Sequence, residues 1–326
     1  MPTWGDILME IGAETLRKNP KAYDEVRRKY LKQLQAHTGR NLVIYASKWS
    51  ISGGERDANI TMISPEDIHG FMEVLHGLQG PALDLLIHSP GGSPEATEAL
   101  VTYIRTKFSD VRVIIPHAAM SAATMLACSA NKILMGKHSF IGPIDPQFLM
   151  DLETGPRLVP AHAILEQFEL AQSQCSNPAL LPSWLPILKQ YGPALIIQCK
   201  LAISLSQELV HAWLRSYMFA GDDEADKKAA ALAACLADHK RFKSHSRFIG
   251  REESRGLGLV IEDLETDKIL QDLVLSVYHA TAHTFNGTGA QKIIENHMGK
   301  AYIKAQQILM VQQLPAQAKL PPRPTP

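Results

Sequence analysis

The sequence predicts an α/β fold in which mostly parallel strands alternate with crossover helices. Three short, predominantly apolar runs are typical of buried strands, at 42–45, 83–88 and 111–115. Helical segments are expected between them, at 64–78 and from Pro94 onward. Strands and helices in this order form a mostly parallel sheet, whose functional residues gather at the carboxyl ends of the strands.

A helical segment is expected ahead of this core. Apolar residues recur near helical spacing over 7–36, and Pro20 should divide the run into two helices because proline interrupts a helix interior. Within the core, Ser64 has the character of an N-cap, with Pro65 at the first helical position and acidic residues in the first turn. A helix over 121–129 and a short strand over 132–135 complete the alternation.

The second half of the chain is predicted to be richer in helix. Residues 160–240 and 267–310 indicate helices, and five prolines in the last twelve residues predict a disordered tail. The expected division is a helical N-terminal segment, an α/β core, a helical C-terminal segment and a Pro-rich disordered tail, at 1–40, 41–265, 266–314 and 315–326.

Composition limits the classes of function. Lys plus Arg and Asp plus Glu are 33 each, and this zero net charge argues against a nucleic-acid-binding domain. No signal peptide and no apolar run of membrane-spanning length is evident, so we expect a cytoplasmic protein without a membrane span. The four cysteines lack metal-ligand spacing and are expected to be free thiols: Cys128, Cys175, Cys199 and Cys235.

Two turns after strands carry groups suited to acyl-transfer chemistry. Gly91 and Gly92 offer bare backbone N–H groups, and Ser121 offers a hydroxyl at the start of a small-residue helix. A serine nucleophile and an oxyanion hole need these two parts. A side chain at either glycine would block the approach of a substrate to the backbone. The alternatives are an N-cap serine and a glycine turn that needs positive φ.

These turns also carry a family resemblance. Ser-Pro-Gly-Gly at 89–92, Ala-Met-Ser-Ala-Ala at 119–123 and Gly-Pro-Ile-Asp-Pro-Gln at 142–147 occur in this order. The combination resembles the Clp protease/crotonase superfamily, and most closely the serine dehydrogenase proteinase family, relatives of signal peptide peptidase A. The resemblance extends over about residues 40–265. It implies a Clp/crotonase-like core and a serine endopeptidase that forms a Ser acyl-enzyme on peptide or protein substrates. It also implies no metal or organic cofactor and a homo-oligomer.

The resemblance assigns roles to residues at the two turns. Ser121 would be the nucleophile, and the N–H groups of Gly92 and Ala122 would form the oxyanion hole. Gly91 and Met120 would contact the substrate.

The catalytic base is less clearly indicated by the sequence than the nucleophile. Clp proteases have the chain order Ser, His, Asp, but Asp145 stands 24 residues after Ser121, where their histidine is found. His245 lies near the position of their aspartate. The serine dehydrogenase proteinases have the order Ser, Asp, His, which implies the triad Ser121, Asp145 and His245. Chain order is free in such triads, whereas geometry is not.

Other histidines remain candidates for the catalytic base. His162, near the start of a predicted helix, is the alternative, and His117 and His138 follow. A Ser–Lys dyad is disfavoured because no lysine lies between Lys137 and Lys189.

The sequence also leaves other functions open. His279 and His283 have a zinc-compatible spacing, but Ala280 stands where a zinc peptidase has its glutamate, so no metal site is expected. A non-catalytic Clp-like oligomeric scaffold is one rival reading of the chain. A crotonase-like acyl-CoA enzyme is another, which would not need a serine at 121.

Overall fold

The computed structural model describes residues 3–50, 58–152 and 155–306. The described strands form a seven-stranded sheet in the order β10-β5-β3-β2-β1-β11-β12. Strands from β10 to β1 pair in parallel, and β11 and β12 are antiparallel additions beside β1. The mostly parallel sheet predicted from the apolar runs is confirmed. Its strands are β1 (Asn41–Ser47), β2 (Ala82–His88), β3 (Asp110–Ile115), β5 (Lys132–Met135), β10 (Ile261–Asp263), β11 (Ala290–Asn296) and β12 (Ala301–Ala305).

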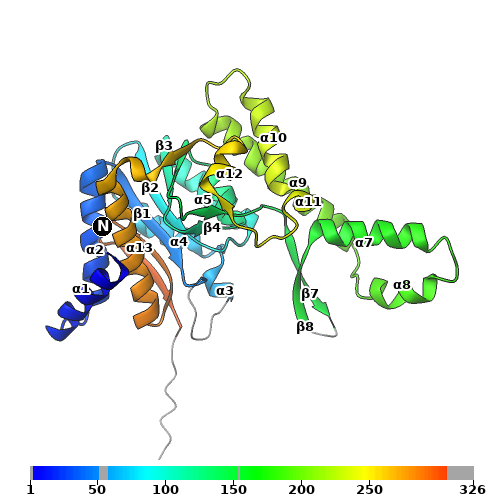
Figure 1. Ribbon diagram of the computed structural model, residues 1–326, viewed down its shortest axis with the longest axis horizontal. Coiled ribbons are helices and arrows are strands. Elements are labelled where there is room, and N and C mark those ends of the chain that lie inside the picture. The colour runs from blue at the N-terminus through cyan, green and yellow to red at the C-terminus, as the bar shows by residue number, and fades with distance from the viewer. Residues whose placement is uncertain (1–2, 51–57, 153–154, 307–326) are drawn as a thin grey trace, which may run out of the picture.

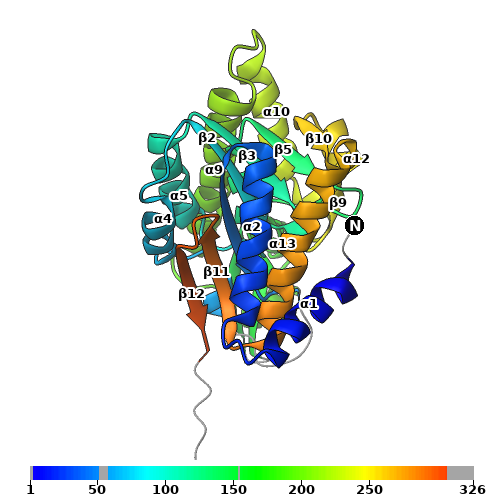
Figure 2. The same cartoon turned by 90° about the vertical axis from the view of Figure 1, so that its left-hand side faces the viewer.

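Helices cover both faces of this sheet. On one face α2 (Ala22–Thr38) and α13 (Lys268–Gly287) lie side by side, as Figure 2 shows, with α1 (Trp4–Leu16) against them. The other face carries α4 (Asp67–Leu75), α5 (Pro94–Lys107) and α6 (Ala122–Cys128). Alternate residues of β1 face the two cores, because successive side chains of a strand point to opposite sides: Val43 joins one core and Ile44 the other.

Local signals explain several element boundaries. Pro20 lies between α1 and α2, as predicted. The Ser93 hydroxyl accepts a hydrogen bond from the Ala96 N–H (3.0 Å), so it caps α5 ahead of Pro94. The helix expected over 64–78 is shorter and begins at Asp67. Asp67 is fully buried and accepts hydrogen bonds from the Ser64 N–H and from Lys292, which holds the preceding residues in a turn.

An arm extends from the body of the molecule (Figure 1). It consists of the hairpin β7 (Gln147–Leu152) and β8 (Gly155–Pro160), followed by α7 (Ala161–Gln174) and α8 (Leu181–Leu188). A small core of its own holds it together, around Ile164. The predicted helices over 160–240 are confirmed, whereas the hairpin was not foreseen. The chain returns to the body through α9 (Leu195–Trp213), a π-helix (Leu214–Met218) and α10 (Ala225–Ala237).

The helical expectation for 266–314 is wrong for its second half. Helix α13 is present, but β11 and β12 follow it as an antiparallel pair. Every residue of β11 is buried, including the charged Lys292 and Glu295. Lys292 pairs with Asp67, and Glu295 pairs with Arg27. The predicted tail over 315–326 lies outside the described residues.

Short elements complete the fold around the carboxyl end of the sheet. A small three-stranded sheet lies there in the order β4-β6-β9. None of the described helices is both long and apolar enough to span a membrane. The remaining elements are α3 (Ala58–Thr61), β4 (Ala118–Ala119), β6 (Phe140–Ile141), α11 (His239–Phe242), β9 (Ile249–Gly250), α12 (Arg251–Gly256) and a 3-10 turn (Leu264–Thr266).

Candidate active site

The two motif turns lie side by side at the carboxyl end of the sheet. Because β2 and β3 are parallel neighbours, the chain leaves both strands at the same edge. The Ser89 N–H donates to the Ala118 carbonyl (3.2 Å), and the Met120 N–H donates to the Ser89 carbonyl (3.0 Å). These backbone bonds fix the Pro-Gly-Gly turn against the turn that carries Ser121.

Ser121 has a strained backbone. Its φ of 51° and ψ of −122° place it among the four non-glycine residues with positive φ in the described part of the chain. Strain of this kind persists only where the surroundings enforce it, and it is typical of a nucleophile on a sharp strand-to-helix turn. Ser121 precedes α6, but its hydroxyl makes no capping hydrogen bond. The side chain is therefore left available at the surface of the turn.

The glycines are required by the protein's own backbone. Gly91 and Gly92 have φ of 94° and 154°. A Cβ at Gly91 would lie 2.5 Å from the Met120 carbonyl oxygen, and one at Gly92 would lie 2.3 Å from the Ile63 carbonyl oxygen. A side chain at either position would therefore collide with neighbouring backbone, in addition to the expected obstruction of a substrate.

Two backbone donors next to Ser121 have no acceptor among the described residues. Ile63 pairs with the glycine turn by donating to the Gly91 carbonyl and accepting from the Ser93 N–H, so the Gly92 N–H faces away from that pairing. The Ala122 N–H begins α6. Neither N–H donates a hydrogen bond to any atom of the described residues. Unpaired N–H groups beside a serine hydroxyl are the donors that an oxyanion needs.

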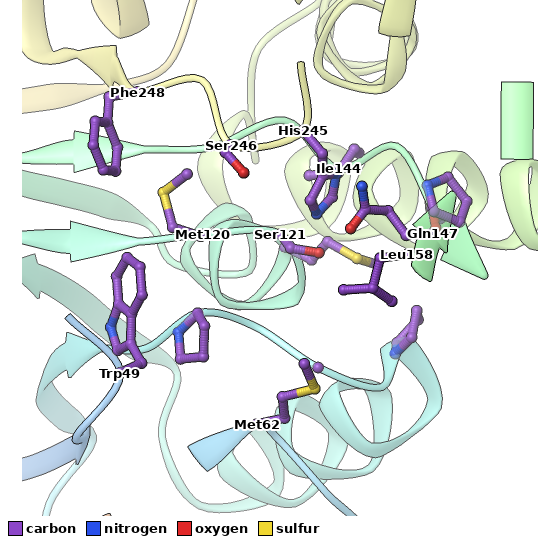
Figure 3. Close-up of a pocket in the computed structure, with 16 residues that line it drawn as sticks. Trp49, Met62, Met120, Ser121, Ile144, Gln147, Leu158, His245, Ser246 and Phe248 are labelled. Atoms are coloured by element: carbon purple, nitrogen blue, oxygen red, sulfur yellow. The ribbon is translucent and has the colours of Figure 1, made fainter. Parts of the chain in front are cut away.

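A cavity of about 350 Å³ opens over Ser121 (Figure 3). Most of its lining is apolar, and it includes Leu158 from the arm as well as residues of the body. Met120 lines the cavity, whereas Gly91 is buried behind the Ser121 turn and does not. The lining residues are Trp49, Met62, Pro90, Gly92, Pro94, Met120, Ser121, Met125, Ile144, Pro146, Gln147, Leu158, Ser206, His245, Ser246 and Phe248.

His245 lies in the same cavity and is bonded to Asp145. Its Nδ1 is 2.8 Å from Asp145 Oδ1, and the aspartate is fully buried. A carboxylate only accepts hydrogen bonds, so His245 Nδ1 is the donor in this contact, and in the neutral ring Nε2 has a lone pair. The structure thus joins Asp145 to His245 and places His245 and Ser121 on one cavity.

A second histidine binds the same carboxylate. His239 Nδ1 lies 2.9 Å from Asp145 Oδ2. Sequence reasoning missed this contact, because His239 is 94 residues from Asp145 and belongs to no motif; its only signal is its place shortly before His245. His162 stacks near His239, with ring centroids 6.4 Å apart, but it does not line the cavity. Burial lowers the pKa of His162, and the neighbouring His239 adds to that effect.

The other candidate histidines lie elsewhere. His117 and His138 line a separate cavity together with Tyr278 and His279 of α13. His283 donates from Nε2 to the Trp4 carbonyl (3.0 Å), so it is engaged with α1 and does not join His279 around an ion. Across the described ranges, no group of three or more His, Cys, Asp or Glu residues could hold a metal ion.

Comparison with known proteins finds a family model that matches part of the chain. Residues 67–180 match the family model of the ClpP-like SDH-type serine proteinases. The match includes Ser121 and Asp145 and ends before His239 and His245. The family resemblance inferred from the three motifs is confirmed.

Two curated relatives of this SDH-type segment are known from Methanocaldococcus jannaschii. The uncharacterized protein MJ1495 is 30% identical over 157 residues, which cover 48% of this chain and 46% of the relative. The uncharacterized protein MJ0137 is 29% identical over 180 residues, which cover 55% and 53%. The match thus spans about half the length of these relatives. No solved structure matches the chain.

Proposed function

We propose that this chain is a serine endopeptidase that cleaves peptide bonds through an acyl-enzyme on Ser121. The observation that carries the proposal is the strained turn of Ser121, whose uncapped hydroxyl lines one cavity together with the Asp145-bonded His245. The family of residues 67–180 supports it.

The proposed reaction uses the groups in hand. Ser121 Oγ attacks the scissile carbonyl while His245 Nε2 takes its proton. The N–H groups of Gly92 and Ala122 stabilise the oxyanion, and Asp145 stabilises the imidazolium. His245 then gives the proton to the departing amine as the peptide C–N bond breaks. Water attacks the Ser121 ester, His245 takes the proton of that water, and the proton returns to Ser121 Oγ as the acid product leaves.

The proposal extends to the whole chain. The core over 41–265 would have the Clp/crotonase arrangement, with flanking segments at 1–40 and 266–314, and would act as a cytoplasmic homo-oligomer on peptide or protein substrates. A scaffold without catalysis would not need the Asp145–His245 pair. An acyl-CoA enzyme of the crotonase type would not need a strained serine, so both rivals leave an observed feature without a role.

Labelling with a fluorophosphonate tests the proposal. We expect the wild-type protein to be labelled at Ser121 and to hydrolyse casein or short peptides. Ser121→Ala should lose both, with a rate lower by about a million-fold. His245→Ala should be similarly inactive, and the double variant should be no worse than either single variant, because triad members act as a unit.

The matched control is Ser246→Ala, which removes another serine hydroxyl from the same cavity. It should retain labelling and hydrolysis. Hydrolysis by purified Ser121→Ala at the wild-type rate, or a label carried by Ser246, would contradict the assignment.

A further inference from the structure

Asp145 serves two histidines at once, which a triad alone does not require. Its two oxygens are divided between His245 Nδ1 (2.8 Å) and His239 Nδ1 (2.9 Å). The Asp145 side chain is 1% exposed, whereas the His239 and His245 side chains are 20% and 17% exposed. One buried negative charge therefore lies between two imidazoles that both reach toward solvent.

We propose that His239 is a positioning residue for the peptidase reaction, which fixes the Asp145 carboxylate and takes up a proton in acid in place of His245. The proposal rests on the proposed serine peptidase function and deepens it by naming how the base is regulated.

The positioning effect follows from hydrogen-bond geometry. With an N–H donor on each oxygen, the carboxylate of Asp145 cannot rotate without losing a bond. Without His239, the Oδ2 oxygen would be buried without this donor, and the ring of His245 would lose its fixed partner. A second layer of hydrogen bonds commonly sets the orientation of functional groups in this way.

The regulatory effect follows from shared charge. Both Nδ1 hydrogens are already directed at Asp145, so an added proton binds Nε2 of either ring. Once one ring is an imidazolium, it offsets the Asp145 charge and repels a second proton from the other ring. When His239 holds the proton, the Nε2 lone pair of His245 stays free. His245 can therefore act as the base at lower pH than it could without His239.

The remaining surroundings of His239 come from α7, from its own short helix α11 and from the helix cap. Glu166 and Lys240 form an ion pair (3.1 Å), and Asp238 caps α11 through the Arg241 N–H (3.1 Å). Asp145 is thus the only carboxylate hydrogen-bonded to His239 among the described residues. The charged and titratable groups are His162, Glu166, Asp238, Lys240 and Arg241.

Two variants of His239 separate the effects. His239→Asn keeps an amide N–H near the place of Nδ1 but cannot ionise. We expect it to retain kcat/KM at neutral pH within a few-fold. The acid limb of its pH profile of kcat/KM should move to higher pH by about one unit, and the limb should have the slope of a single protonation. His239→Phe keeps a ring but removes the donor, and should also lower the neutral-pH plateau of kcat/KM by roughly tenfold or more.

The matched control is His69→Asn, which removes an exposed imidazole away from the cavity and leaves both bonds to Asp145 in place. Its pH profile should overlay that of the wild type. The profile is measured both by peptide hydrolysis and by the rate of fluorophosphonate labelling at Ser121.

The outcomes distinguish the two proposals. A labelled, active wild type whose acid limb is unchanged in His239→Asn overturns the role of His239 and leaves the peptidase standing. An unlabelled, inactive wild type overturns the peptidase. In either case, NMR titration of the histidine Cε1–H signals in Ser121→Ala provides a readout without activity: His245 should gain its proton at higher pH when His239 is asparagine, and no change would overturn the coupling.

Discussion

At Ser121 the backbone conformation sets the direction of the side chain. The residue is held at φ 51° by the hydrogen bonds that join its turn to Ser89, and by the contact with Gly91. A non-glycine residue in this conformation costs on the order of 1–3 kcal/mol, which the surrounding turns must offset. The stability of the molecule is thus lowered where its chemistry is proposed to occur.

Replacing this serine should reveal the strain. We expect Ser121→Gly to be more stable than Ser121→Ala by about 1 kcal/mol, because glycine adopts positive φ without steric cost. Urea denaturation of the two variants measures the difference. At Ser246, which does not have positive φ, the order should be reversed, since glycine there only adds disorder to the unfolded chain. Equal stability of the two Ser121 variants would show that the turn is unstrained.

The sequence predicts some residues of this site better than others. Ser121 and the glycines stand in motifs, and the bond between Asp145 and His245 was anticipated from the family order. His239 was not, because its partner is distant in the chain and no pattern links them. Gly91 was expected to touch the substrate, but its lack of a side chain serves the close approach of the Ser121 turn.

Strand β11 is connected to the glycine turn through a buried lysine, Lys292. Lys292 Nζ donates to both oxygens of Asp67 (2.8 Å each) and to the Met62 carbonyl (2.7 Å). Met62 precedes Ile63, whose backbone pairs with the Gly91–Ser93 turn. Burial lowers the pKa of Lys292, and the charge of Asp67 opposes this effect. A strand from the end of the chain is therefore coupled to the oxyanion turn through one buried ion pair.

Breaking this pair should be costly. Lys292→Met leaves the buried Asp67 charge without its main partner, and we expect the free energy of unfolding to fall by about 3–5 kcal/mol. Replacing both residues, as Lys292→Met with Asp67→Asn, should recover part of the loss. The control is Lys132→Met, whose exposed pair with Glu262 should contribute less than about 1 kcal/mol. The free energies of unfolding are measured by urea denaturation. An equally small decrease in both lysine variants would contradict the coupling.

Buried ion pairs explain why β11 was predicted as helix. Strands β1, β2 and β3 were recognisable because their residues are mostly apolar. In β11, Lys292 and Glu295 flank the apolar pair at 293–294, and a charged residue is normally solvated. Only partners brought from α4 and α2 make their burial possible, and those partners are invisible in the local sequence.

Buried histidines should make the free energy of unfolding of the whole molecule decrease as the pH falls. Burial lowers the pKa of His88 from 6.5 to about 3, with His117 adding to the effect, and lowers that of His279 to about 4. The unfolded chain therefore binds more protons than the folded one between these values and 6.5. Stability is full above pH 6.5 and is lost as the pH falls toward 3.

The effect of His88 is measurable by itself. Between pH 7 and pH 4.5 its share of the loss should be on the order of 3 kcal/mol. We expect His88→Phe, which keeps a ring beside Trp49 and Tyr278, to show a flatter dependence of unfolding free energy on pH. The exposed His69→Asn should leave the slope unchanged. A slope as steep in His88→Phe as in the wild type would assign the acid sensitivity to other groups.

The order of strands in the sheet also has a consequence for biosynthesis. The parallel block from β5 to β1 is bordered by β10 and β11, which both come from residues beyond 260. On the ribosome, the block emerges with both edges unpaired. At roughly 5–20 residues per second, the wait for its bordering strands is on the order of ten seconds. An open edge is a template for other chains. Overexpression therefore meets its main aggregation hazard during translation, before the finished protein exists.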